Sequence, residues 1–226
     1  AWVTISARHE TFEVNEVSVS GCTVRDTPGI VAGASDLRGE SNTHKAMEAV
    51  GLTDIAVVTV GPQLPTAERE ALRELLSQEW GSGGLWFIIT RFDEAGVDPL
   101  GDLSGYRELA QRKQAELRAS LQLGDGLPVF VVAQDYGQIT GFERNPGASV
   151  WDISREWDGI SEVLQAIDQL ARSTPVGLRQ DAAVRFWTRA VSQMLGALRD
   201  ELETYRMNLR ITQEGVDQRG SWLRQL

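Results

Sequence analysis

The sequence is poor in cysteine and contains no long apolar run. Its single cysteine, Cys22, excludes an internal disulfide framework and suits a reducing compartment. The apolar surroundings of Cys22 predict a small buried side chain rather than a reactive thiol. No stretch approaches the roughly 20 uninterrupted apolar residues that span a bilayer, and no signal peptide opens the chain. The chain starts at Ala1-Trp2 without a methionine, which predicts a true N-terminus further upstream.

Positive charge is also scarce. The 226 residues include 22 Lys and Arg against 32 Asp and Glu, which gives a formal net charge of −10. Non-specific binding to nucleic acid needs a basic surface, so this balance disfavours such a function. Only two of the basic residues are lysines, Lys45 and Lys113, which limits where a lysine-containing motif can lie.

Strand-like and helix-like stretches alternate from Ala1 to about Arg172. The later strand candidates are short and almost continuously apolar, which is typical of strands buried on both faces of a parallel sheet. The first two candidates alternate and indicate an antiparallel edge hairpin. The predicted strands are Val3–Ala7, Thr11–Val14, Val17–Arg25, Ile55–Val60, Leu85–Thr90 and Val129–Ala133.

Amphipathic helices are predicted between these strands. One begins at the N-cap candidate Thr66, and the others cover Tyr106–Leu123 and Ile160–Leu170. Strand and helix alternation at these lengths predicts a doubly wound, mostly parallel α/β fold. The pattern breaks at Thr174-Pro175, after which the sequence predicts one long helix with an apolar stripe that must pack on another surface. We therefore expect two regions, residues 1–172 and 173–226.

The first candidate site residues follow the strand Val17–Arg25, in the segment Asp26-Thr27-Pro28-Gly29. A carboxylate at the end of a buried strand can hold the water shell of a Mg²⁺ ion. Gly29 lets its backbone N–H approach a phosphate because it has no Cβ. The Gly-, Ser- and Ala-rich residues 31–42 would then form a mobile switch. The alternative is an ordinary strand that ends in a Pro-Gly turn.

A second signature, Thr90-Arg91-Phe92-Asp93, lies 64 residues after Asp26 and also follows an apolar run. One carboxylate can accept from both N1–H and the exocyclic N2–H₂ of guanine, which adenine cannot offer, so Asp93 would select the base. Arg91 would lie over the base face, and Thr90 would bond to a phosphate loop. Taken by itself, this segment is better explained by a surface Arg and Asp at a strand-to-loop junction.

A third, weaker candidate is Ala133, at the end of the strand Val129–Ala133. Its backbone N–H could donate to guanine O6. The three candidates follow one another in order, each at the carboxyl end of an apolar strand. This order is stronger evidence for a ligand site than any one candidate, because ligands of open α/β sheets bind at those ends.

The phosphate-binding sequence G-x-x-x-x-G-K-[S/T] does not occur in these 226 residues, because neither Lys45 nor Lys113 has the required glycines before it. Two explanations remain. A segment that carries the loop, together with the first strand and helix of the sheet, precedes this sequence, or the protein has no such loop and hydrolyses nothing. We expect the first.

Together these segments resemble the GTPase domain of the dynamin superfamily, in particular bacterial dynamin-like proteins. The resemblance covers about 150 residues and rests on Asp26–Gly29, on Thr53–Val60 and on Thr90–Asp93, with Gln63–Glu70 resembling the start of the next helix. The long helix after Pro175 resembles the passage into a neck or stalk bundle. The main departures are Arg91 in place of the usual lysine and the absent phosphate loop.

The resemblance implies an incomplete GTPase domain at 1–172, a helical neck at 173–226, and GTP, GDP and Mg²⁺ as ligands. Asp26, Thr27 and Gly29 would serve Mg²⁺ and the γ-phosphate, and Thr4 is the candidate for the switch threonine that ligates Mg²⁺. Thr90, Arg91, Asp93 and Ala133 would serve the base. The implied protein is cytoplasmic, self-associates through the GTPase domain and the helical bundle, and acts at a membrane surface.

Two functions of different classes stay open. One is a Mg²⁺-dependent GTPase that couples hydrolysis to self-assembly, and the other is a degenerate, non-hydrolysing scaffold or partner-binding module. A small switch GTPase that binds RNA or ribosomes is disfavoured by the acidic charge and the long helix.

Overall fold

The computed structural model describes residues 15–27, 45–46, 48–51, 53–64, 69–77, 80, 83–138, 147–173 and 176–225. The predicted strands Val3–Ala7 and Thr11–Val14 lie outside these residues, as do Thr4, Gly29, Thr66 and the predicted switch at 31–42. The chain divides into two compact units, residues 1–183 and 184–226. The helices and strands in chain order are β1 (Asn15–Val19), β2 (Cys22–Asp26), β3 (Ala56–Val60), α2 (Arg69–Ser77), β4 (Leu85–Ile89), η1 (Phe92–Ala95), α3 (Leu103–Leu121), β5 (Val129–Val131), η2 (Tyr136–Gln138), η3 (Ala148–Ile153), α4 (Ile160–Arg172) and α5 (Val176–Leu223).

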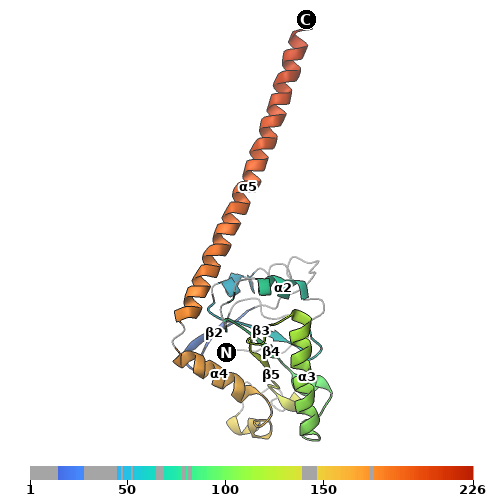
Figure 1. Cartoon of the computed structure of the whole chain (residues 1–226), viewed down its shortest axis with the longest axis vertical. Helices are drawn as coiled ribbons and strands as arrows, with labels where there is room; N and C mark the ends of the chain where they lie inside the picture. Colours follow the sequence, from blue (N-terminus) through green and yellow to red (C-terminus); the bar gives the residue numbers. More distant parts are fainter. Residues whose placement is uncertain are drawn as a thin grey trace. The chain divides into compact units, whose positions relative to one another are not determined.

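The centre of the first unit is a parallel three-stranded sheet in the order β3-β4-β5. These strands match three predicted apolar runs to within two residues, which confirms the mixed α/β class. Figure 1 shows α3 along one side of this sheet and α4 on the other. The middle strand β4 is the most buried, and its Phe87 and Ile89 pack with Leu117 of α3 in the main hydrophobic core.

Burial of β3 differs from our prediction. We expected both faces of this strand to be buried, but Val57 and Thr59 are exposed. The exposed residues alternate with Ala56, Val58 and Val60, so one face of β3 packs on the core and the other is left uncovered by the described residues. Ala56 and Val60, at the two ends of β3, belong to the core, and the partly buried Val58 between them packs against it.

The prediction of a single strand over Val17–Arg25 is wrong. The segment forms the antiparallel hairpin β1–β2, a two-stranded sheet in which Val19 faces Cys22. The two residues between the strands, Ser20 and Gly21, have φ of 50° and 81°. Positive φ at both central residues belongs to the type I′ turn, whose twist matches that of a two-residue hairpin. The side chain of Cys22 is half-buried rather than buried.

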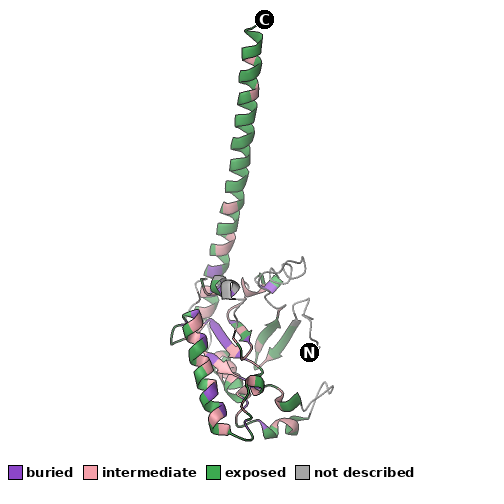
Figure 2. Cartoon of the chain, turned by 90° about the vertical axis from the view of Figure 1, so that its right-hand side faces the viewer, coloured by how far each residue is buried: buried purple, intermediate pink, exposed green. Residues whose placement is uncertain are grey.

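The second unit is the continuation of α5, a 48-residue helix that begins at Val176. The predicted long helix is therefore confirmed. Figure 2 shows that α5 is exposed over most of its length. Its exposed apolar side chains include Trp187, Val191, Met194, Leu195, Leu198, Leu202, Tyr205, Leu209, Val216 and Leu223. Among the described residues, no helix has both the length and the apolar content needed to cross a bilayer.

Candidate functional site

The loop after β4 lies at the carboxyl edge of the parallel sheet and is bonded to both neighbouring strands. The backbone N–H of Thr90 donates to the carbonyl of Val60 at the end of β3, with an N–O distance of 2.8 Å. On the other side, Val132 N–H donates to Ile89 O (2.8 Å), and Phe92 N–H donates to Val132 O (3.1 Å). The second signature therefore occupies the edge where open α/β sheets bind ligands.

Thr90 and Arg91 extend this connection through their side chains and backbone. The hydroxyl of Thr90 donates to Val60 O at 3.3 Å, which ties the side chain to the end of β3. Arg91 has left-handed backbone angles of φ 52° and ψ 42°. Its N–H donates to Oε1 of Gln134 at 3.0 Å, and this contact with the loop after β5 supports the unusual conformation.

The Arg91 guanidinium lies over the end of β3. A Cβ added to Gly61 would stand 3.7 Å from Nη2 of Arg91, while Nη1 is 3.7 Å from Oε2 of Glu94. The side chain is still 60% exposed, so this ion pair is solvated and weak. A planar cation with an open face is suited to stacking on an aromatic base.

Asp93 lies in the first turn of η1, and its carboxylate accepts from its own backbone N–H and from that of Gly137. Burial raises the pKa of Asp93 above its ordinary value, and the negative charges of Glu94 and Asp135 act in the same direction. The two backbone hydrogen bonds oppose this effect without cancelling it. Asp93 therefore combines partial desolvation with a fixed backbone frame, as a carboxylate that recognises a ligand requires.

A group of aromatic side chains beneath this loop was not predicted from the sequence. Phe92 has no exposed surface and contacts Tyr106 edge-on, with ring centroids 5.3 Å apart. Tyr106 in turn contacts Trp157 (5.4 Å), and Trp157 contacts Tyr136 (5.1 Å). The Tyr136 hydroxyl donates to Oδ1 of Asp98 at 2.7 Å, and this bond raises the pKa of Tyr136. Sequence spacing gave no signal for this cluster, because its members come from η1, α3, η2 and the turn before α4.

Ala133 does not offer the hydrogen bond that we predicted. It is buried, and its backbone N–H already donates to the carbonyl of Asp158 at 2.9 Å. That N–H is therefore unavailable to guanine O6. Because β5 ends at Val131, Ala133 lies in the loop after the strand, and its N–H joins this loop to the turn before α4.

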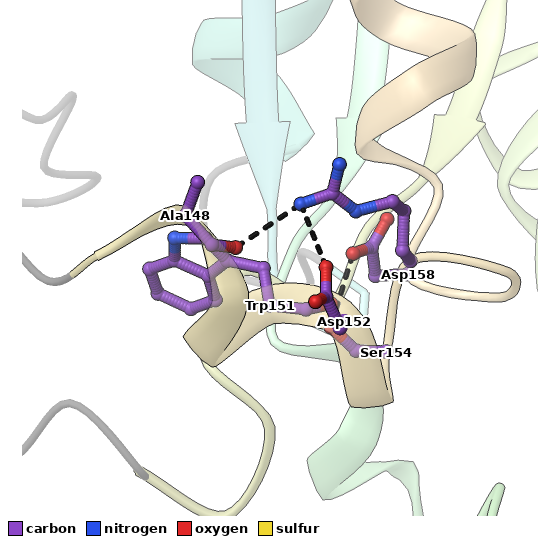
Figure 3. A network of polar contacts seen from close by, with 6 residues as sticks. Ala148, Trp151, Asp152, Ser154 and Asp158 are labelled. Atoms are coloured by element: carbon purple, nitrogen blue, oxygen red, sulfur yellow. Dashed lines mark hydrogen bonds and ion pairs between the residues drawn. The ribbon is translucent and has the colours of Figure 1, made fainter.

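Asp158 anchors this turn through both of its carboxylate oxygens, as Figure 3 shows in part. Oδ1 accepts from the N–H of Ile160 (2.9 Å), at the first turn of α4, and Oδ2 accepts from the hydroxyl of Ser154 (3.1 Å). The adjacent Gly159 has a φ of 74°, and a Cβ there would stand 1.9 Å from the carbonyl oxygen of Val131. Only glycine allows α4 to begin this close to β5.

The η3 segment that carries this turn is held by the other contacts in Figure 3. Nη2 of Arg155 lies 3.1 Å from the carbonyl of Ala148 and 3.2 Å from Oδ1 of Asp152. The Ser154 backbone N–H also donates to Trp151 O. These contacts order the residues before Asp158 and so support the loop that contains Ala133.

The segment that begins with Asp26 is placed differently from the loop after β4. Asp26 is exposed at the end of β2, so the expected carboxylate at the end of a buried strand is not what the structure has. Thr27 is half-buried, and Gly29 and Thr4 lie outside the described residues. Among the residues that the structure covers, no group of three or more His, Cys, Asp or Glu side chains is placed to hold a metal ion.

Comparisons with known proteins identify the class of fold. No protein-family model matches the chain, and no curated protein matches it. Among solved structures, it resembles the LeoA bacterial dynamin GTPase from ETEC, with a TM-score of 0.51 and 17% sequence identity over 84% of this chain. The fold is therefore dynamin-like. The match covers 34% of the LeoA chain, so the present sequence spans about a third of that protein's length.

Proposed function

We propose that the protein binds guanine nucleotides, with the base recognised by the loop after β4. The observation that carries this proposal is the position of Asp93, a partly desolvated carboxylate at the carboxyl edge of the sheet. Its oxygens can accept from N1–H and N2–H₂ of guanine. The exposed guanidinium of Arg91, fixed by the bond from its backbone to Gln134, would stack on the base.

In the full-length protein, this binding would support hydrolysis of GTP to GDP and phosphate with Mg²⁺. Asp26 would hold the ion through its water shell, and Thr27 and Gly29 would contact the γ-phosphate, with Thr4 as a further Mg²⁺ ligand. These assignments rest on the order of the signatures and on the dynamin-like fold.

The nucleotide state would be coupled to self-assembly through α5. A solvated helix does not keep so many exposed apolar residues without a surface to pack on, and α5 carries this stripe from Val176 to Leu223. Assembly at a membrane surface and a cytoplasmic location belong to the same proposal and rest on the dynamin-like resemblance alone.

One observation favours a second function, a non-hydrolysing scaffold. The sequence has only two lysines, and neither lies in a phosphate-binding loop. Release of phosphate from GTP by the full-length protein separates the two functions: turnover supports the GTPase, and nucleotide binding without turnover supports the scaffold.

Calorimetric titration of the full-length protein with GDP and ADP tests the guanine site. We expect GDP to bind at least about 100-fold more tightly than ADP, because adenine would leave the buried side of Asp93 without donors. An Asp125→Asn variant is a suitable control, since Asp125 lies in the exposed turn after α3 and should leave both affinities unchanged. Equal affinity for the two nucleotides would remove the role given to Asp93.

A further inference from the structure

The O6 atom of a bound guanine has no donor among the groups considered so far. Asp93 can serve the N1–H and N2–H₂ donors of the base, but a carboxylate cannot donate to its O6 acceptor. The backbone N–H of Ala133 is already bonded to Asp158 O. Because an acceptor that loses its water without gaining a partner weakens binding, we expect a site that selects guanine to hold a further donor near Asp93.

The side chain of Gln134, the residue after Ala133, is anchored to the loop after β4. Its Oε1 accepts from the backbone N–H of Arg91 at 3.0 Å. This contact fixes which end of the amide is which, because a backbone N–H needs an oxygen as its partner. The Nε2 end carries two N–H donors. Within the described part of the chain Nε2 donates to no other residue, and the side chain is exposed.

The loops after β4 and after β5 are joined on both sides of this amide. Arg91 N–H bonds to the Gln134 side chain, and three residues further along the second loop Gly137 N–H bonds to the Asp93 carboxylate. These two bonds hold the Gln134 amide and the Asp93 carboxylate at the same edge of the sheet. In guanine, O6 is adjacent to N1, so a base held by Asp93 presents O6 to a donor beside that carboxylate.

We propose that Gln134 is a specificity-determining residue whose Nε2 donates a hydrogen bond to O6 of the bound guanine. This inference rests on the proposed guanine site and names the residue that completes it. The amide is already ordered by its bond to Arg91, so it loses little rotamer entropy when it meets the base. Because Oε1 is engaged by Arg91, the group offers only donors to a ligand.

The consequence is selectivity at a second position of the base. Adenine carries an amino group at C6, so the Nε2 donors of Gln134 would meet another donor there. Hypoxanthine and xanthine keep the 6-oxo group of guanine. Gln134 therefore separates 6-oxo from 6-amino purines, while Asp93 reads positions 1 and 2 of the ring.

The first test is a Gln134→Met variant of the full-length protein, titrated with GDP and with 2-aminopurine riboside diphosphate. The base 2-aminopurine keeps the 2-amino group of guanine but has no substituent at C6. We expect GDP affinity to fall about fivefold, the size of effect given by one lost hydrogen bond between neutral groups, and the affinity for the 2-aminopurine nucleotide to stay unchanged. Gln111→Met, at an exposed position of α3, is the matched control and should change neither affinity.

A Gln134→Glu variant separates contact with the base from support of Arg91. Glutamate keeps an acceptor for the Arg91 N–H, but it places an oxygen where the amide had its donors. That oxygen repels guanine O6 and accepts from the 6-amino group of adenine. We expect the ratio of GDP affinity to ADP affinity to fall by at least about tenfold.

Unchanged GDP affinity in Gln134→Met would overturn the inference while leaving the guanine site intact. An equal loss for GDP and the 2-aminopurine nucleotide in this variant, with GDP affinity restored in Gln134→Glu, would also overturn it, because this pattern describes a residue that only holds Arg91 in place. Failure of the wild-type protein to bind GDP would overturn the proposed function and this inference together.

Discussion

The end of β4 and the end of β2 each present an aspartate within a short signature, but the two ends are built differently. The loop after β4 is hydrogen-bonded to β3 and to the residues after β5, and Phe92 beneath it is completely buried. The hairpin β1–β2 forms a sheet of its own in which Asp26 is exposed. Packing therefore changes the chemistry of Asp93, whose pKa is raised by burial.

The largest difference between the two ends should appear in stability. Phe92→Ala removes a fully buried ring and should lower the free energy of unfolding by about 3–5 kcal/mol, from lost burial plus the cavity left behind. Val24→Ala, at a β2 position that is 38% exposed, should change it by no more than about 0.5 kcal/mol. Denaturant unfolding of both variants measures the contrast. Similar losses in the two variants would mean that the hairpin is packed as tightly as the loop after β4.

A smaller effect should appear in the pH dependence of nucleotide binding. Guanine requires the ionised form of Asp93, and burial raises the pKa of this group above its ordinary value of 3.8. As the pH falls through the raised pKa, GDP affinity should weaken by about tenfold per pH unit, beginning at a higher pH than for an ordinary aspartate. Titrations across the acid range measure this, and a midpoint at or below 3.8 would contradict the assignment.

The raised pKa of Asp93 also makes the free energy of unfolding depend on pH. A carboxyl group with a raised folded-state pKa binds its proton more tightly in the folded protein than in the unfolded chain. Its ionisation therefore opposes folding as the pH rises from 3.8 through the raised pKa. In the Asp93→Asn variant, the free energy of unfolding should no longer fall over this pH range. The pH dependence that comes from the other titrating groups should be unchanged.

The sequence predicted the parallel strands and main helices well because each has a strong local pattern. The apolar run of β4 and the stripe of α3 through Leu109, Leu117 and Leu121 are examples. The hairpin was missed although Ser20-Gly21 is a two-residue turn signal, since apolar alternation continues across it.

The detailed site could not be predicted in the same way. Ala133 was correctly placed near a strand end, but its N–H is used by Asp158, a residue 25 positions later in the chain. Tyr106 lies in a helix stripe that looks like ordinary core, and its packing against Phe92 and Trp157 joins elements that are far apart in the sequence. Such contacts are set by tertiary packing, and no local spacing encodes them.

The most direct test of the guanine site is the base preference of Asp93→Asn in the full-length protein, measured by calorimetry with GDP and xanthosine diphosphate. Asparagine presents an amide donor where the carboxylate had an acceptor, and xanthine has a carbonyl in place of the 2-amino group of guanine. We predict that GDP affinity falls by about 100-fold or more and that the xanthine nucleotide becomes the tighter ligand. An unchanged preference for GDP would contradict the assignment of Asp93 as the residue that recognises the base.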